Sequence, residues 1–240
     1  MADRFYTSSP LDHGKTLLQG PEAHHLATVR RFRNGDRVVL FNGDGREYIA
    51  EIESVQRNQV ELNVVEILRP QRELPFRLEL AAPLPKGDRA DFLVEKLTEL
   101  GVTDFVPLRT ERSVVHPRET KLDRLQRAVI EASKQCGRNS LMQIHDLTDW
   151  KTYCAKTAGP APRFIADRTG AARSFENLPG DRCCAIGPEG GFSDDELTAA
   201  TEFGWQLTGL GPRILRVETA AIAMAVIAGY VSSARGGPRE

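Results

Sequence analysis

Two glycine-rich segments in the C-terminal part of the chain have the composition of ligand-binding loops. The first, Ile186-Gly-Pro-Glu-Gly-Gly-Phe-Ser193, directly follows the apolar run Cys183–Ile186. Its glycines and proline let the backbone bend tightly and leave N–H and C=O groups uncovered. Ser193 and Glu196 have the spacing of a capping box, which predicts a helix start after the turn. A strand followed by a glycine-rich turn and the N-terminus of a helix is typical of small-ligand sites in α/β proteins. The alternative is a tight turn that binds no ligand.

The second glycine segment, Leu207-Thr-Gly-Leu-Gly-Pro-Arg213, also ends a predicted strand, and the charged residues Arg216 and Glu218 follow it. The residues from Ala220 to Val231 are apolar on nearly every side of a helix. Such a helix must be buried in a core or against a second subunit. Two glycine segments at the ends of neighbouring strands predict two walls of one pocket, with two independent turns as the alternative.

Several motifs of other enzyme classes are missing from the chain. No G-x-G-x-x-G opens a helix early in the α/β region, and neither G-x-x-x-x-G-K-[ST] nor G-x-S-x-G occurs. The five histidines are scattered, and the four cysteines show no C-x-x-C spacing. We therefore expect reduced thiols and no metal site, and we do not expect a nucleotide hydrolase or a serine hydrolase.

Basic residues are concentrated locally although the 240-residue chain has a net charge of −1. The neutral total argues against a general nucleic-acid coat protein. Between Arg109 and Arg138, however, eight Lys or Arg residues stand against four acidic ones, and Arg30, Arg31 and Arg33 form a second cluster. Such clusters bind phosphates, although a charged helix face is as often only solvated.

The periodicity of the sequence changes near residue 70, which predicts two domains. Residues 1–70 alternate apolar and polar positions over short segments and predict a small β-barrel with one helix at Pro21–Val29. The polar segment Arg69–Pro75, with two prolines, is the expected boundary. Residues 75–240 alternate strands and helices, which predicts a largely parallel sheet covered by helices on both faces. The strands are expected at 77–84, 104–108, 143–145, 163–166, 182–186 and 205–210, and the helices at 88–100 with Asp88 as cap, 120–136, 149–157, 194–203 and 218–234.

No segment has the length of a membrane span. The longest apolar run, Ala220–Val231, is well short of the ~20 residues that a span needs, and the start of the chain has no signal segment. A composition of 40% apolar and 27% charged residues is typical of a soluble globular protein. We therefore expect a cytoplasmic protein.

The motifs taken together resemble one family, the RsmE-type 16S rRNA uridine-N3 methyltransferases. The resemblance rests first on Ile186–Phe192, Leu210–Arg216 and Glu218-Thr-Ala220. Further segments match in the same order: Lys96–Val102, Glu111–Ser113, Glu131–Arg138, and His24-His25 followed by Arg30 and Gly35-Asp36. It covers essentially the whole chain. The departures are small: Leu97, Lys134–Cys136 and Val217.

The resemblance implies a SPOUT-class α/β fold whose C-terminal chain forms a trefoil knot, preceded by a PUA-like β-barrel that helps to hold RNA. Knots are rare, and the sequence pattern alone argues against one. The resemblance further implies S-adenosylmethionine as cofactor, 16S rRNA in the small ribosomal subunit as partner, and a homodimer with its active site completed across the interface. The implied cofactor-binding residues are Ile186, Gly187, Pro188, Glu189, Gly190, Gly191, Leu210, Gly211, Ile214, Leu215, Arg216, Thr219 and Ala220.

Methyl transfer to N3 of a uridine requires removal of the N3 proton and stabilisation of the uracil anion. From charge and placement, we predict that Arg216 stabilises the anion and that Glu218 or Glu189 orients or accepts the proton. The predicted RNA-binding residues are Arg4, Arg30, Arg31, Arg33, Arg112 and Arg138. Two alternatives stay open: an RNA-binding or assembly protein with a vestigial pocket, and a nicotinamide-dependent enzyme.

Overall fold

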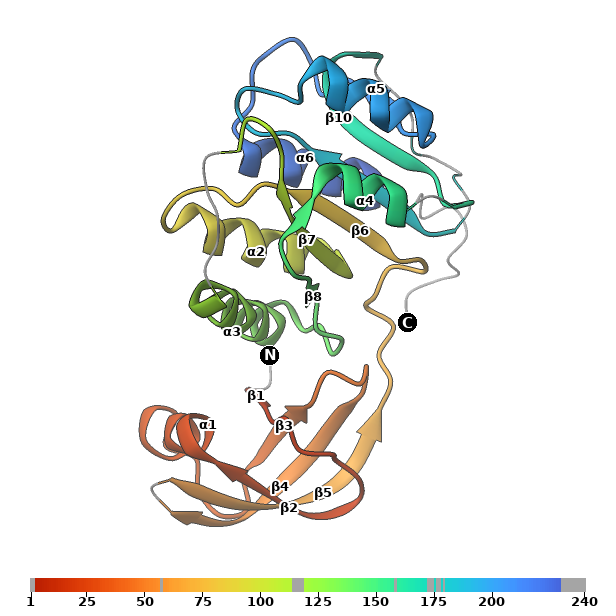
Figure 1. The fold of residues 1–240 in the computed structure, drawn as a ribbon. Coiled ribbons are helices and arrows are strands. Elements are labelled where there is room, and N and C mark those ends of the chain that lie inside the picture. Colours follow the sequence, from red (N-terminus) through yellow and green to blue (C-terminus); the bar gives the residue numbers. More distant parts are fainter. Residues whose placement is uncertain are drawn as a thin grey trace. The chain divides into compact units, whose positions relative to one another are not determined.

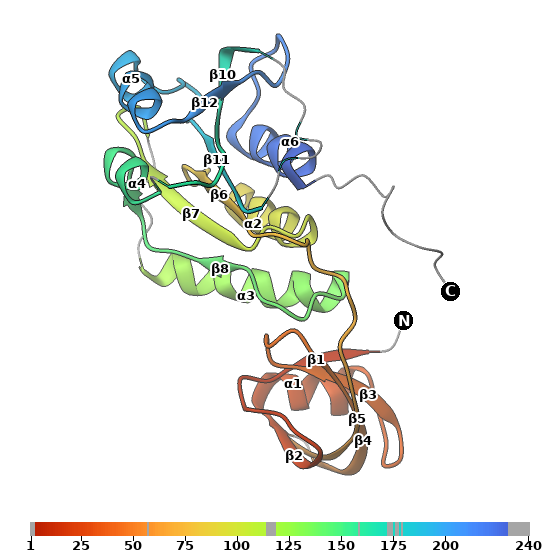
Figure 2. The same cartoon turned by 90° about the vertical axis from the view of Figure 1, so that its right-hand side faces the viewer.

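The computed structural model describes residues 3–56, 58–113, 119–157, 159–171, 175, 178 and 180–229 (Figures 1 and 2). The chain divides into two compact units. The first unit consists of Met1–Glu73 together with Ile130–Leu141, and the second consists of Leu74–Val129 together with Met142–Glu240.

The first unit contains a curled five-stranded sheet. Its strands are β1 (Arg4–Tyr6), β2 (Gly14–Gln19), β3 (Arg37–Phe41), β4 (Glu47–Gln56) and β5 (Gln59–Leu68), in the spatial order β1-β3-β4-β5-β2. All pairs are antiparallel except β1 with β3. The alternation in these segments places one side of each strand in an apolar core that includes Phe5, Tyr48 and Leu62.

The helix predicted at Pro21–Val29 is present, but its second half is wound more loosely than an α-helix. Helix α1 covers Gly20–His24, and a π-helical turn, η1, follows at His25–Val29. The N–H of Arg30 donates to the carbonyl oxygen of His25 at 3.0 Å, which is the five-residue spacing of a π-helix. Arg31 then adopts φ +58°, a left-handed conformation that is uncommon for arginine.

A buried cluster of charges joins distant segments within the first unit. Arg4 and Arg72 both pair with Glu47, and a second Arg4 nitrogen donates to the Asn139 side chain. Arg138 forms a bidentate pair with Glu73. Arg4 and Arg138 are both buried, so the prediction that they contact RNA does not agree with the structure. Their charges are instead used to hold Ile130–Leu141 against the curled sheet.

The second unit contains a parallel sheet, as its alternating pattern predicts. Its strands are β6 (Leu78–Ala82), β7 (Asp104–Arg109), β8 (Gln143–Ile144), β9 (Thr148–Asp149), β10 (Arg163–Ala171), β11 (Arg182–Ile186) and β12 (Gln206–Thr208). The spatial order is β12-β10-β11-β6-β7-β8, with β9 also paired to β7. Strand β10 is longer than the predicted 163–166 because Ala171 pairs again with Thr208 after an irregularity.

Helices cover both faces of this sheet (Figure 2). Helices α2 (Arg89–Glu99) and α6 (Val217–Gly229) pack together on one face, and α4 (Trp150–Lys156) and α5 (Asp194–Glu202) lie on the other. Helix α3 (Glu119–Cys136) contributes residues to both units. The final helix was predicted to reach residue 234, but residues 230–234 lie outside the described part of the chain. Among the described helices, none combines the length and the apolar character of a membrane span.

The two predicted helix caps differ in outcome. Ser193 and Glu196 form the capping box at the start of α5. Asp88 makes no capping hydrogen bond to α2, which contradicts the prediction. The backbone of Asp88 is already helical (φ −71°, ψ −12°), whereas a capping residue is extended, and its Oδ1 accepts a hydrogen bond from Arg124 Nη2 at 2.9 Å.

The charge cluster of the first unit yields a stability prediction. Changing Glu47 to Gln leaves the buried Arg4 guanidinium without its carboxylate, and we expect a loss of about 3–5 kcal/mol in the free energy of unfolding measured with urea. Glu53→Gln is the control, because Glu53 pairs with the exposed Lys15 and its change should cost less than about 1 kcal/mol. Equal losses in the two variants would contradict this assignment.

The same ion pair predicts a pH dependence. Burial raises the pKa of Glu47, but hydrogen bonds from Arg72 and Arg4 outweigh burial and hold that pKa below its usual range. A carboxylate whose pKa is lowered on folding stabilises the protein above its unfolded-state pKa, and this stabilisation disappears as the pH falls through the folded-state pKa. The stability difference between wild type and Glu47→Gln should therefore shrink as the solution is acidified.

Candidate functional site

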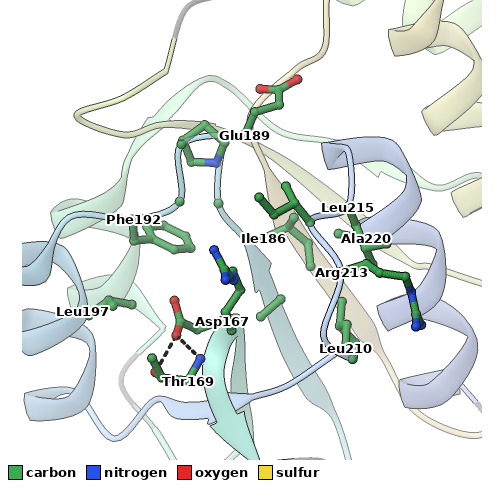
Figure 3. Close-up of a pocket in the computed structure, with 18 of the residues that line it drawn as sticks. Asp167, Thr169, Ile186, Glu189, Phe192, Leu197, Leu210, Arg213, Leu215 and Ala220 are labelled. Carbon is green, nitrogen blue, oxygen red and sulfur yellow. Dashed lines mark hydrogen bonds between the residues drawn. The ribbon is translucent and has the colours of Figure 1, made fainter.

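A cavity of about 310 Å³ lies at the carboxyl ends of β10, β11 and β12 (Figure 3). The carboxyl edge of a parallel sheet is where α/β folds commonly bind ligands. Apolar side chains form much of the wall: Phe192 and Leu197 lie on one side, and Leu210, Leu215 and Ala220 lie on the other. The cavity therefore has the lining for a partly apolar small molecule.

The two glycine segments do form two walls of this one cavity. The predicted cofactor-binding residues that line it are Ile186, Gly187, Pro188, Glu189, Gly190, Gly191, Leu210, Gly211, Ile214, Leu215 and Ala220. Arg216 and Thr219 do not line it, and both are exposed on the surface of the unit.

The first glycine loop is held by hydrogen bonds, of which only the capping box between Ser193 and Glu196 was predicted from the sequence. Arg112 Nη1 donates to the carbonyl oxygen of Gly190 at 2.7 Å, so this predicted RNA-binding residue braces the loop. Glu196 accepts the backbone N–H of Glu111 at 2.9 Å with one carboxylate oxygen and that of Ser193 with the other. These hydrogen bonds fix the loop on the segment that follows β7.

An aromatic cluster anchors the same loop to the core. The Phe192 ring packs 4.6 Å from the Trp150 ring, between centroids, and Trp150 in turn contacts Trp205. The indole Nε1 of Trp150 donates to the carbonyl oxygen of Glu196 at 3.0 Å. An alanine Cβ at position 187 would lie 2.9 Å from the Phe192 ring, so glycine is required there for the ring to pack.

The second glycine loop passes close to the end of β10. The N–H of Gly209 donates to the carbonyl oxygen of Ala171 at 3.0 Å. A Cβ on Gly170 would lie 2.5 Å from the backbone nitrogen of Thr208, and a Cβ on Gly209 would collide with the carbonyl oxygen of Gly170. Two glycines are therefore needed for the two backbones to pass each other here.

The third wall of the cavity, Ala166–Thr169, was not predicted from the sequence. Asp167 is half-buried, and its Oδ1 accepts hydrogen bonds from the N–H and the hydroxyl of Thr169 at 2.8 and 2.6 Å. Its carboxylate lies at the floor of the cavity in Figure 3. The signal available in the sequence was its position directly after a predicted strand of the same sheet.

The predicted catalytic carboxylates occupy two different environments. Glu189 stands at the rim of the cavity with its side chain half-exposed, and the carboxylate points away from the cavity in Figure 3. Glu218 is buried in the first turn of α6, does not line the cavity, and pairs with Arg89 at 3.3 Å. Arg89 was not singled out from the sequence, although it follows the end of β6 at the same sheet edge.

Two free cysteines, Cys183 and Cys184, lie in β11 ahead of the first glycine loop. Burial raises the pKa of Cys183 to about 12, and it raises the pKa of Cys184 beyond the physiological range. A thiol that stays protonated is a poor nucleophile. Among the described residues, no group of three or more His, Cys, Asp or Glu is placed to hold a metal ion.

The remaining predicted RNA-binding residues lie in the first unit. Arg30, Arg31 and Arg33 are exposed and follow the π-helical turn η1. Arg30 pairs with Asp3, whereas the N–H of Arg33 donates to Asp36. They form a basic, solvent-exposed turn beside Val29, which is 60% exposed.

Comparison with known proteins relates both units to RNA-modifying enzymes. Residues 72–229 match the family described as RNA methyltransferase domain, and residues 18–65 match the RNA methyltransferase PUA domain. The ribosomal RNA small subunit methyltransferase E of Synechocystis is 35% identical over 90% of this chain and 73% of its own length. That of Bacillus subtilis is 32% identical over 96% of both chains.

Two solved structures are similar over nearly the whole chain. A putative methyltransferase from Legionella pneumophila, in complex with the cofactor SAM, has a TM-score of 0.87 and 31% identity, with 95% of this chain and 97% of that chain covered. A ribosomal RNA small subunit methyltransferase E from Neisseria gonorrhoeae, bound to S-adenosyl methionine, has a TM-score of 0.87 and 29% identity, with coverage of 94% and 95%.

The close passage at Gly170 and Gly209 yields a second stability prediction. Gly209→Ala forces one backbone away from the other, and we expect a loss of more than about 2 kcal/mol in the free energy of unfolding. Gly159→Ala is the matched control, since its Cβ would meet its nearest neighbour only at 3.9 Å and its cost should stay within about 0.5 kcal/mol. If urea unfolding shows the two variants to be equally stable, the passage is not as tight as described.

Proposed function

Because the chain belongs to the ribosomal RNA small subunit methyltransferase E family, we propose that it transfers a methyl group from S-adenosylmethionine to 16S rRNA. The observation that carries this proposal is that two glycine loops line one shared cavity at the carboxyl edge of the parallel sheet. We further propose N3 of a uridine as the acceptor atom, on the resemblance of both loops to the uridine-N3 enzymes. The reaction then takes place in the cytoplasm, on RNA of the small ribosomal subunit.

The residues of the cavity fit S-adenosylmethionine. The adenine ring is flat and apolar on its faces, and it suits the space between Phe192, Leu210 and Leu215. The cofactor also carries hydroxyl groups and positive charge, for which the Asp167 carboxylate on the cavity floor is a suitable partner. The uncovered backbone groups of the glycine loops complete this polar lining.

We propose that the second unit is knotted. In such a knot, the chain after β12 threads a loop formed by earlier residues. The close approach of residues 208–209 to residues 170–171 supports this proposal, because a threaded chain passes close to the loop around it. The cavity lies directly beside this close approach, since Thr169 and Leu210 both line it.

We also propose that the protein is a homodimer. Helix α6 is apolar on nearly all sides, and Val226 on this helix is 48% exposed. Phe92 on the adjacent helix α2 is 47% exposed, and Ile214 in the second glycine loop is 72% exposed. Covering these side chains with a second copy removes apolar surface from water and places the interface beside the cavity.

The chemistry requires placement of the acceptor and control of one proton. When bound, S-adenosylmethionine supplies an activated methyl group on its sulfonium. The loops orient this group for an in-line attack by N3. The exposed guanidinium of Arg216 can meet the uracil and stabilise its anion, and Glu189 at the rim accepts or orients the N3 proton. The burial of Glu218 and its pairing with Arg89 suit a positioning role better than direct proton transfer.

Mass spectrometry of 16S rRNA tests the reaction directly. Small subunits from a strain that lacks this protein should gain one N3-methyluridine when incubated with the purified enzyme and S-adenosylmethionine. Arg216→Ala should abolish this transfer while the affinity for S-adenosylmethionine, measured by calorimetry, stays nearly unchanged, because Arg216 does not line the cavity. Arg127→Ala, an exposed arginine on α3, serves as the control. Full activity of Arg216→Ala would remove Arg216 from the mechanism.

The exposed arginines of the first unit should neutralise phosphates of the RNA. Replacing Arg31 and Arg33 with Ala should weaken binding to small subunits. The negative slope of log affinity against log salt concentration should become shallower by about 1 for each phosphate that is no longer neutralised. Lys15→Ala is the control, as Lys15 is an exposed cation on β2 that pairs with Glu53. Unchanged affinity and slope in the double variant would reject this turn as part of the RNA-binding surface.

A further inference from the structure

We infer that Arg89 is a positioning residue that sets the spacing of the two cofactor loops, an inference that rests on the proposed function. Arg89 is the first residue of α2. Its Nη1 lies 3.3 Å from Oε1 of Glu218 and 4.0 Å from Oε1 of Glu189. Glu189 belongs to the first glycine loop, and Glu218 lies in the first turn of α6, directly after the second loop. One guanidinium therefore lies near the first loop and also pairs with the helix into which the second loop leads.

Of the two carboxylates near Arg89, Glu218 depends more on the guanidinium because it is buried. The Glu218 side chain is only 8% exposed, and a buried carboxylate needs a cation or several hydrogen bonds to stay ionised. Arg89 supplies that cation. Among the described residues, Oε2 of Glu218 is buried and has no hydrogen-bond partner. Arg89 is therefore the main compensation for this charge, and Glu218 is tied to α2.

The interaction with Glu189 is weaker by comparison. The Glu189 side chain is 54% exposed, and 4.0 Å is longer than a hydrogen bond. A pair of this kind contributes little to folding in water. It does give the loop a preferred position, because the carboxylate of Glu189 stays near a guanidinium that Glu218 holds in place. The buried ion pair thus supports the exposed one.

Helix α2 is suited to carry this residue. The side chains of Leu93, Val94 and Leu97 are fully buried, and α2 packs along α6. The helix therefore cannot shift without disturbing the core. A cation at the start of a helix is opposed by the helix dipole, which disfavours arginine there unless a carboxylate compensates it. Glu218 is the carboxylate that compensates Arg89 at this helix start.

Binding of S-adenosylmethionine to Arg89 variants tests the inference. Arg89→Ala should raise the dissociation constant about tenfold, because the guanidinium near both Glu189 and Glu218 is lost. Arg89→Lys should keep most of the affinity, because it keeps the positive charge. Glu189→Gln should raise it less than Arg89→Ala does. The effects of Arg89→Ala and Glu218→Gln should be far from additive, because each change removes the same pair.

Arg124→Ala is the matched control. Arg124 pairs with Asp88 and Asp91 at the start of the same helix but contacts neither loop among the described residues. Its change should leave the affinity and the methylation rate unaltered. A urea unfolding curve for each variant separates positioning from folding, since a merely structural role would lower stability without raising the dissociation constant of the folded protein.

The outcomes distinguish this inference from the function on which it rests. If the wild-type protein does not bind S-adenosylmethionine, the proposed function fails. If the wild type binds it and Arg89→Ala binds it equally well, the positioning role fails alone. If Arg89→Ala does not fold, Glu189→Gln decides: wild-type affinity for S-adenosylmethionine in that variant, or additive effects on this affinity of changes at 189 and 218, would overturn the role of Arg89.

Discussion

The close passage of two backbone segments at Gly170 and Gly209 is the constraint on which the cavity depends. A side chain on either residue would meet the opposite backbone, so the second glycine loop can turn toward the first loop only because both positions lack one. The hydrogen bond from Gly209 to Ala171 then fixes the passage. Leu210, Gly211 and Ile214 follow it directly and become one wall, while Asp167 and Thr169 precede it and become the floor.

Charge is used in two different ways in this chain. In the first unit, Arg4, Glu47 and Arg138 are buried and connect segments that are far apart in sequence. In the second unit, Arg89 lies near Glu189 and Arg112 donates to Gly190, and both of these partners belong to the first glycine loop of the cavity. Both arrangements use arginine, whose planar guanidinium with several donors can serve two partners at once. The net charge of −1 does not indicate how many arginines pair with carboxylates inside the protein.

The layout of the second unit was predictable because its elements follow strong local patterns. Apolar segments at β6, β7 and β11 alternate with amphipathic helices, and this alternation leads to a parallel sheet with helices on both faces. The two glycine loops were found for the same reason, since each interrupts such a pattern. The π-helical turn at His25–Val29 was not predictable, because nothing in the residues themselves separates it from an α-helix. The capping role expected of Asp88 failed because its backbone is helical where a capping residue is extended, and its carboxylate pairs with Arg124.

The sequence by itself determined the alternation of elements, the two glycine loops and the family resemblance, because these depend on residue type and on spacing along the chain. Only the tertiary structure decided the burial of Arg4 and Arg138, the role of Asp167 in the cavity wall, and the ion pair between Arg89 and Glu218. Arg89 and Glu218 are 129 residues apart, and no local pattern links them. Their pairing exists because α2 and α6 pack on the same face of the sheet, which is a property of the folded chain alone.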